Sequence, residues 1–387
     1  MFERFDAVVV GVGGFGSSSL YHLAKHGSRV LGLDRFPAGH DQGSSHGDTR
    51  ITRQAYFEHP DYVPLLLRSY DLWRELESES GRDLLTICGL LLSGPADGEA
   101  IPGSLTASRE HGVAIESVAA SDVRERFPGF EFPDGFDTVF EPGGGFLKVE
   151  DCVRTHVELA CQHGARFHSD EPVVGWTSDG ETVRVRTERG EYEAASLVIT
   201  AGPWAADLLN GDQNQTSPAE EIAGRLEVRR KSLLWNRVRS DAYNLENGGC
   251  GFLFEMPEGQ FYGFPSLDGQ TIKLSEHTGG EVVIDPLHID RSLRESDVNP
   301  LARFASEVLS DVEPAPIRHS ICMYTLTPDS HFLIDRHPEH SNVWYGAGFS
   351  GHGFKFTSVI GEALAELAIE GRTDAPVGFL GAGRLLD

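Results

Sequence analysis

The sequence predicts an α/β protein in which a β-rich domain is inserted into a domain built on a parallel sheet. Three observations support this prediction. A buried strand, a glycine loop and a helix come first, a second buried strand ends in small residues near position 202, and strand, glycines and helix return after position 343. Such alternation is typical of a parallel sheet, whereas short alternating strands fill much of the chain between.

The first segment begins with DAVVV at 6–10, an unbroken apolar run that is typical of a buried parallel strand. A glycine loop and a helix from about Gly14 to His26 follow, and SRVLGLD at 28–34 is the next expected strand. Residues 61–80 are expected to form an amphipathic helix with Pro64 near its first turn.

The middle of the chain is expected to be more varied. Residues 83–145 are mixed, and residues 151–164 are expected to form a helix that Asp151 opens and Gly164 closes. PVVGWTS and ETVRVRTERGEYEAA predict a hairpin at about 172–192, ahead of the buried strand in SLVITAGPWA at 196–205. Residues 215–320 carry β-like runs with few clear helices. The chain then returns to a strand and glycine loop in NVWYGAGFSGHGFKF and to a helix in TSVIGEALAELAIEG.

The length of 387 residues suits two closely associated domains better than one small core. We expect residues 1–82, 146–214 and 322–387 to form one discontinuous domain on the parallel sheet. Residues 83–145 and 215–321 are expected to form the inserted domain.

Charge is the most unusual feature of the composition. The chain has 59 acidic and 33 basic residues, a net charge of −26. A field of that sign repels nucleic acid and anionic membranes, so we expect neither as a partner. The sequence has no apolar run long enough to cross a membrane, no cleavable signal pattern, and five irregularly spaced cysteines that argue against a disulfide framework. These features predict a cytoplasmic protein.

The glycine loop has the pattern Gly11-x-Gly13-x-x-Gly16, and Asp34 follows it at the end of the next strand. Glycines at this spacing let the backbone approach a pyrophosphate at a helix N-terminus, and the acid can accept hydrogen bonds from a ribose. The motif indicates a dinucleotide but does not choose between NAD and FAD. The hairpin at 172–192, the VITAG strand end and the C-terminal glycine loop resemble three later returns to one large cofactor. This segmentation resembles the glutathione-reductase-like FAD fold of amine and amino-acid oxidases.

Long strings across the chain resemble the family of monomeric sarcosine oxidase and N-methyltryptophan oxidase. The strings are SSHGDTRITRQAYFEHPDYVPLLLRS (44–69), FYGFPS (261–266), IKLSEH (272–277), CMYTLTPDSHFLIDRHPEHSNV (322–343) and GAGFSGHGFKF (346–356). The resemblance implies FAD as the cofactor, tethered through a thioether from the flavin 8α carbon to Cys322. It implies these FAD-binding residues: Gly11, Gly13, Gly16, Asp34, Ser44, His46, Thr49, Arg50, Val173, Ala201, Gly202, Cys322, Gly348, Gly351, Gly353 and Lys355.

The same resemblance implies the substrate site. Arg53 and Lys355 match the residues that hold the substrate carboxylate. Tyr262 and His277 match residues that line the substrate side, with a core phenol and imidazole as the alternative, and Tyr324 is expected to shape the pocket. Lys273 matches the lysine that promotes reaction of the reduced flavin with oxygen, and Arg50 and His277, with Tyr262, complete the implied catalytic set. Four cations, Arg50, Arg53, Lys273 and Lys355, are expected to converge in one anion pocket; isolated surface ion pairs are the alternative.

The family's reaction is the oxidation of secondary amino acids such as sarcosine or N-methyltryptophan. Hydride passes from the carbon next to nitrogen to FAD, oxygen reoxidises the flavin to give hydrogen peroxide, and the imine hydrolyses to amino acid and formaldehyde. Three alternatives stay open: an oxidase of cyclic imino acids such as pipecolate or proline, a noncovalent FAD dehydrogenase with another electron acceptor, and a flavin-binding subunit of a larger complex. The family also implies a monomer whose partners are a small carboxylated amine and oxygen.

Three departures from the family's strings concern the substrate. Ser45 stands where a histidine is common, Phe261 stands where a second tyrosine is usual, and Glu276 adjoins His277. Among other motifs, HPEH at 337–340 has no second His or Cys set, so we expect no metal site. GFSGHG is not a nucleophile elbow, and the chain has no P-loop.

Only five of the 33 basic residues are lysine, at positions 25, 148, 231, 273 and 355. Acid-rich, lysine-poor surfaces suit concentrated salt, so we hypothesise a halophilic source; a GC-rich genome that favours arginine is the alternative. If the source is halophilic, the melting temperature rises with salt, because screening weakens the repulsion among surface carboxylates. Thermal unfolding measured from low to molar salt checks this, and unchanged stability at low salt removes the hypothesis.

Overall fold

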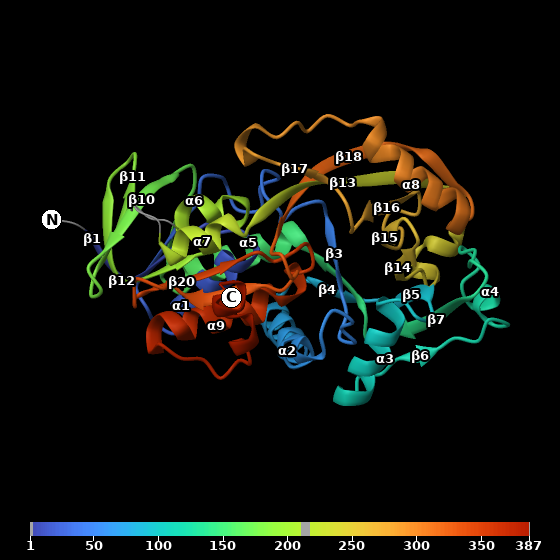
Figure 1. Ribbon diagram of the computed structural model, residues 1–387, viewed down its shortest axis with the longest axis horizontal. Helices are drawn as coiled ribbons and strands as arrows, with labels where there is room; N and C mark the ends of the chain where they lie inside the picture. Colours follow the sequence, from blue (N-terminus) through green and yellow to red (C-terminus); the bar gives the residue numbers. More distant parts are fainter. Residues whose placement is uncertain (1–2, 210–216, 387) are drawn as a thin grey trace.

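The computed structural model describes residues 3–209 and 217–386, and two large sheets dominate it (Figure 1). The eight-stranded sheet takes its strands from residues 3–33, 166–199 and 333–347. The nine-stranded sheet takes its strands from residues 90–141, 227–282 and 312–326. Both sheets therefore join segments that are far apart in the sequence.

The eight-stranded sheet has parallel strands at its centre. β1 (Glu3–Val10) lies between β12 (Glu191–Ile199) and β2 (Val30–Leu33), and β9 (Arg166–His168) and β20 (Val343–Ala347) extend the parallel part. β10 (Val173–Ser178), β11 (Val183–Thr187) and β19 (Leu333–Arg336) pair antiparallel at the periphery. β1 and β2 are almost continuously apolar and buried, as expected of strands covered on both faces.

Helices α1 (Gly14–Lys25), α5 (Val149–Gln162) and α9 (Thr357–Glu370) pack together beside this sheet, and α2 (Val63–Ser80) packs on α9 (Figure 1). α1 and α9 approach so closely that a Cβ on Gly361 would lie 2.2 Å from Ser18 Oγ and 2.4 Å from Ser18 Cβ. α6 (Ala205–Leu209) and α7 (Pro218–Gly224) follow β12.

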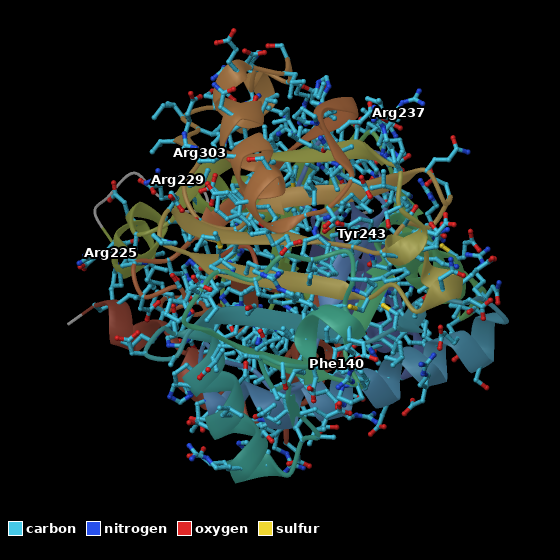
Figure 2. The ribbon with its side chains drawn as sticks, turned by 90° about the vertical axis from the view of Figure 1, so that its right-hand side faces the viewer. Phe140, Arg225, Arg229, Arg237, Tyr243 and Arg303 are labelled. Carbon is cyan, nitrogen blue, oxygen red and sulfur yellow. The ribbon has the colours of Figure 1, made fainter. Side chains whose placement is uncertain are left out.

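The nine-stranded sheet is mostly antiparallel. Its strands are β5 (Leu90–Pro95), β6 (Glu116–Ser117), β7 (Phe136–Glu141), β13 (Glu227–Val238), β14 (Gly251–Met256), β15 (Gly259–Gly263), β16 (Thr271–Glu276), β17 (Glu281–Val282) and β18 (Val312–Leu326). The accompanying helices are α3 (Ala100–His111), α4 (Val123–Arg126) and α8 (Glu295–Val308). Figure 2 looks onto this end of the molecule, where Tyr243 is buried and Arg237 and Arg303 are exposed. Phe130, Phe252 and Phe254 form an aromatic core here.

A three-stranded sheet stands between the two large ones and carries residues of the expected site. It consists of β3 (Thr49–Thr52), β8 (Gly145–Lys148) and β4 (Leu85–Ile87) (Figure 1). Arg50 lies on β3, and Arg53 follows the strand directly. Pairing with β8 therefore fixes the backbone from which both arginines project.

Most expected elements are present, with three differences. The helix expected at 151–164 begins two residues earlier, at Val149, so Asp151 lies in its first turn and does not open it. α8 was not expected, because Pro300 and four charged residues obscure its apolar face. The predicted boundary at residues 321 and 322 falls within β18, and the one at 214 lies outside the described residues. Among the described helices, none is long and apolar enough to cross a membrane.

The contact between α1 and α9 yields a stability prediction. Gly361→Ala should lower the free energy of unfolding by about 1–3 kcal/mol, because the added methyl group overlaps Ser18. Gly224→Ala is the matched control, since Gly224 ends α7 with nothing within 4 Å of a Cβ, and it should leave stability unchanged or slightly raised. Denaturant unfolding compares the two, and equal effects would contradict the close-packing argument.

Candidate active site

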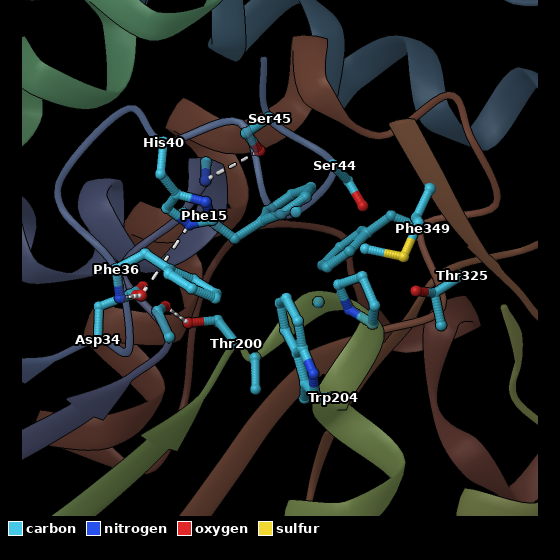
Figure 3. Close-up of a pocket in the computed structure, with 18 of the residues that line it drawn as sticks. Phe15, Asp34, Phe36, His40, Ser44, Ser45, Thr200, Trp204, Thr325 and Phe349 are labelled. Atoms are coloured by element: carbon cyan, nitrogen blue, oxygen red, sulfur yellow. Dashed lines mark hydrogen bonds and ion pairs between the residues drawn. The ribbon is translucent and has the colours of Figure 1, made fainter. Parts of the chain in front are cut away.

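A large cavity lies where the parallel strands of the eight-stranded sheet end (Figure 3). Its wall takes residues from the glycine loop after β1 and from the turns after β2, β12 and β20. The carboxyl ends of neighbouring parallel strands meet at one edge of a sheet, which is where nucleotides bind in open α/β folds. The sheet thus brings four distant segments of the chain to one cavity.

The glycine loop leaves its backbone open to a ligand. Gly11 has a φ of 85°, and a Cβ there would lie 2.6 Å from Ala201 Cα. A Cβ on Gly16 would lie 1.9 Å from the carbonyl oxygen of Gly11. Both positions therefore require glycine. The N-terminus of the twelve-residue helix α1 borders the cavity, where backbone N–H groups favour a pyrophosphate.

Asp34 directly follows β2 and lies at the wall of this cavity (Figure 3). Its carboxylate accepts the N–H of Val12 at 2.6 Å and the N–H of Phe36 at 2.8 Å. Burial raises the pKa of Asp34 to about 6, although both hydrogen bonds act in the opposite direction. The remaining lone pairs of this fixed carboxylate are suited to ribose hydroxyls.

Other features of the wall also fit a large polar and aromatic cofactor. Trp204 Nε1 and Thr325 Oγ1 are buried and have no hydrogen-bond partner among the described residues, although buried polar groups normally have one. Phe15 and Phe349 stack with ring centroids 3.4 Å apart (Figure 3). The donors, the aromatic faces and the glycine loop together fit FAD.

A smaller cavity adjoins the larger one, because Arg50, Tyr324, Gly351 and Phe354 line both. Its other lining residues mix apolar and charged groups: Ile51, Arg53, Phe57, Glu58, Leu253, Tyr262, His277, His352 and Lys355. Three of the four cations expected to converge do so here. A group bound in this cavity would stand beside a group bound in the larger one.

Arg53 is paired inside this cavity with Glu58, a residue that the sequence did not single out. Arg53 Nη2 lies 2.5 Å from Glu58 Oε2, and the guanidinium lies 4.1 Å and 4.0 Å from the ring centroids of Tyr56 and Phe57. Burial acts to raise the pKa of Glu58, but the charge of Arg53, followed by the interactions with His352 and Lys355, outweighs it and lowers the pKa to about 2. Glu58 therefore stays ionised beside Arg53.

Lys355 is less well compensated. It lies in the short helix Phe354–Phe356, is 5% exposed, and donates one hydrogen bond, of 2.7 Å, to the carbonyl oxygen of His352. Burial, followed by the like charge of Arg53, lowers the pKa of Lys355 to about 7. An anion entering the cavity would stabilise its charged form.

The two cavity histidines differ in their freedom to bind a ligand. His352 Nε2 lies 2.9 Å from the carbonyl oxygen of Ser330, so it donates, and Nδ1 then accepts the Tyr56 hydroxyl at 2.5 Å. The His277 ring nitrogens have no hydrogen bond within residues 3–209 and 217–386. Burial, followed by the interaction with His352, lowers the pKa of His277 to about 3, so this ring is neutral. Its unprotonated nitrogen can accept a hydrogen bond from a ligand N–H.

Cys322 lies close to the boundary between the cavities. Its Sγ is 3.3 Å from Arg50 Nη2 and 3.4 Å from the carbonyl oxygen of Ser44. The hydroxyl groups of Tyr262 and Tyr324 are 3.2 Å apart, and both rings line the smaller cavity. The guanidinium of Arg50 thus stands next to the thiol, as a tethering role would require.

Lys273 differs from the expectation, because it does not line the smaller cavity with the other three cations. Its ammonium donates to the carbonyl oxygens of Gly47 at 2.7 Å and Thr49 at 2.6 Å. Burial, followed by the like charge of Arg50, lowers the pKa of Lys273 well below its ordinary value. The ammonium of Lys273 is therefore held by hydrogen bonds to the backbone that leads into β3.

Most expected residues line one cavity or the other. The larger takes Gly11, Gly13, Asp34, Ser44, Arg50, Val173, Ala201, Gly202, Tyr324, Gly348, Gly351 and Gly353, and the smaller takes Arg50, Arg53, Tyr262, His277, Tyr324, Gly351 and Lys355. Five expected residues do not line either cavity: Gly16, His46, Thr49, Lys273 and Cys322. Glu58, His352, Phe15 and Phe349 were missed, since acids, histidines and aromatics near a motif carry no signal of their own.

Comparison with known proteins decides the family. The model of the FAD-dependent oxidoreductase family matches residues 6–367. The chain belongs to this family of FAD-dependent oxidoreductases. The predicted α/β FAD-binding fold is therefore confirmed, and the resemblance to monomeric sarcosine oxidase and N-methyltryptophan oxidase is confirmed by two curated relatives.

Monomeric sarcosine oxidase of Streptomyces avermitilis is 38% identical over 391 residues, covering 100% of this chain and 99% of the relative. N-methyl-L-tryptophan oxidase of Escherichia coli is 32% identical, covering 96% of each chain. Among solved structures, the open form of NikD, an unusual amino acid oxidase essential for nikkomycin biosynthesis, has a TM-score of 0.84 at 26% identity, with 98% and 97% of the two chains covered. This FAD-dependent oxidoreductase thus shares its full length with amine and amino acid oxidases.

Because Lys355 is buried with little compensation, Lys355→Met should stabilise the protein in the absence of carboxylate ligands, by about 1–3 kcal/mol near pH 7. The folded pKa of Lys355 is about 7, below its unfolded value, so the unfolded state binds more protons between these pKa values and wild-type stability rises with pH there. The stabilisation should therefore shrink as the pH rises from 7 towards 10. Denaturant unfolding across this range checks it, and a variant less stable at every pH would contradict the argument.

Proposed function

We propose that this oxidoreductase oxidises secondary amino acids, with N-methyl amino acids such as sarcosine or N-methyltryptophan as its substrates. The observation that carries the proposal is the pair of adjoining cavities. Arg53 and Lys355 face the smaller cavity, and Arg50 and Tyr324 connect it with the cavity that fits FAD. A carboxylate held by two cations would thereby place its α-amino group near the flavin. The names of the curated relatives support an N-methylated amine.

Bound FAD supplies the two-electron oxidation of the carbon next to nitrogen and passes the electrons to oxygen, giving hydrogen peroxide. Arg53 and Lys355 bind the carboxylate, since a guanidinium fork and an ammonium together hold this group in a site with little water. Nearby cations lower the pKa of the bound amine and favour the neutral form that can release a hydride. Neutral His277 is free to accept a hydrogen bond from the amine, whereas the hydrogen bond to the Ser330 carbonyl oxygen fixes His352. The imine product hydrolyses to an amino acid and formaldehyde.

Two further roles belong to the proposal. Lys273 stabilises the negative charge that develops as oxygen is reduced, since its ammonium is buried and fixed by two carbonyl groups. Cys322 tethers the flavin, supported by the guanidinium of Arg50, whose Nη2 lies 3.3 Å from the Cys322 sulfur.

We also propose the expected cellular setting and organisation. All five cysteines are free thiols, which fits a reducing, cytoplasmic compartment. A monomer is supported by the relative named monomeric, and a halophilic source by the net charge of −26. The division of the chain into two discontinuous domains also remains our proposal.

A peroxide-release screen tests the proposed activity. Sarcosine or N-methyltryptophan should give peroxide and formaldehyde with this protein, and glycine and dimethylamine should not, because each lacks one recognised group. Activity only on pipecolate or proline would favour the cyclic alternative. Flavin reduction without peroxide would favour a dehydrogenase, and no flavin reduction by any of these amines would overturn the proposal.

The tether generates a separate prediction. In the wild type, yellow colour should stay with the polypeptide after acid denaturation, and intact mass should include the flavin. In Cys322→Ser the flavin should leave on denaturation, because the hydroxyl is a far weaker nucleophile than a thiolate. Cys152→Ser is the matched control, since this buried cysteine lies in α5, and it should keep the colour. Colour retained by Cys322→Ser would refute the tether.

A further inference from the structure

The loop that enters β3 is held by charged side chains from four different elements. Glu150 of α5 binds its N–H groups, Lys273 of β16 binds its carbonyl oxygens, Arg318 of β18 binds the Asp48 carboxylate, and Arg50 of β3 binds the Ser44 and Thr49 carbonyl oxygens. These contacts fall on residues 44–49, so the backbone at the end of the loop and the start of β3 is fixed. Its position determines where Lys273 can place its ammonium.

Glu150 occupies a small anion-binding nest in this loop. Gly47 has a φ of 90° and Asp48 a φ of 67°, left-handed conformations that turn two successive N–H groups to one side. The Gly47 N–H donates to Glu150 Oε1 at 2.6 Å, and the Asp48 N–H donates to Oε2 at 3.1 Å. The Val149 N–H at the start of α5 also donates to the Asp48 carbonyl oxygen at 2.9 Å, which fixes the helix against the loop.

One peptide group connects Glu150 with Lys273. The peptide between Gly47 and Asp48 donates its N–H to the Glu150 carboxylate and accepts the Lys273 ammonium, at 2.7 Å, on its carbonyl oxygen. An anion at the N–H and a cation at the C=O polarise a peptide in the same direction, so each hydrogen bond strengthens the other. The buried charge of Lys273 is thereby compensated through this peptide.

We propose that Glu150 is a positioning residue for Lys273, holding the Gly47–Asp48 peptide so that its carbonyl oxygen fixes the charged ammonium. The inference rests on the proposed function, in which Lys273 assists the reaction of reduced flavin with oxygen. Glu150 does not touch substrate or flavin in this account; it acts through the loop alone.

Other groups facing Lys273 do not replace Glu150. Phe264 and Trp235 present their rings at 4.0 Å and 5.8 Å from the ammonium, and Arg50 adds a like charge. The charge of Asp48, more than that of Glu150, acts to raise the pKa of Lys273, but the Asp48 carboxylate pairs with Arg318 at 2.8 Å and 2.9 Å at a partly exposed position. Glu150 is the carboxylate that binds the loop backbone directly.

The test uses the holoenzyme with ¹³Cε-labelled lysine, because five lysines give few signals. Lys273→Met identifies the Lys273 signal. In Glu150→Gln, one oxygen can still accept the Gly47 N–H and the longer contact of the Asp48 N–H at 3.3 Å, but the charge and the 3.1 Å bond from Asp48 to the second oxygen are lost. The pKa of Lys273 should then fall by about 0.5–1 unit. Glu158→Gln is the matched control on the same helix, where Glu158 pairs with Arg82 at the surface, and it should not change the titration.

A second measurement follows the flavin after photoreduction, when it is mixed with oxygen without any amine. Glu150→Gln should reoxidise about 5-fold more slowly than wild type, and Glu158→Gln at the wild-type rate. If the reduced flavin of the wild type itself reoxidises slowly, the proposed oxidase function fails. The titration of Lys273 then still tests whether Glu150 acts on Lys273. An unchanged Lys273 titration in Glu150→Gln, or an equal shift in Glu158→Gln, overturns the inference.

Hydrogen exchange of the wild type covers the case in which Glu150→Gln does not fold. The Gly47 and Asp48 amides should exchange slowly near neutral pH, because both donate to the carboxylate. Rapid exchange at both amides in the folded protein would show that Glu150 does not hold the loop, and would overturn the inference by itself.

Discussion

The structure depends on how positive charge is kept inside the protein next to a cavity. Arg50, Arg53, Lys273 and Lys355 are each no more than 9% exposed, and an unpaired ion in such a place costs several kcal/mol. Arg50 and Lys273 are compensated by backbone carbonyl oxygens and Arg53 by Glu58. Lys355 has one carbonyl oxygen and a share in the charge of Glu58, which pairs with Arg53, so Lys355 has the most to gain when an anion enters.

Carboxylates from separate elements position these cations. Glu58 pairs with Arg53 inside the smaller cavity, and Glu150 holds the loop that binds Lys273. Glu141, at the end of β7, accepts the N–H of Gln54 at 2.5 Å and of Ala55 at 3.1 Å, which fixes the backbone after Arg53. Burial raises the pKa of Glu141 to about 7. The nine-stranded sheet therefore supports Arg53 through a carboxyl group whose pKa is close to neutral pH. Each end of the molecule thus contributes to one cationic site.

The local parts of this arrangement could be predicted from the sequence. Gly11, Gly16 and Asp34 form a motif of fixed spacing, and DAVVV and SLVIT are apolar runs, so the FAD cavity and its sheet were predictable. Contacts between distant segments of the chain could not be predicted from the sequence. Glu58 and Glu150 are two of 59 acidic residues, and nothing local separates them from surface charges. The capture of Lys273 by the Gly47 and Thr49 carbonyl oxygens depends on how β16 meets β3, which no spacing in the sequence encodes.

The measurement that tests the cationic cavity most directly is the binding of acetate, followed by the flavin absorbance as a function of pH. The account predicts that acetate binds best below pH about 7, that its Kd rises as Lys355 loses its proton, and that acetamide binds at least about 10-fold more weakly. In Lys355→Met, acetate should bind weakly and without this pH dependence. Equal binding of acetate and acetamide, unchanged in the variant, would contradict the account.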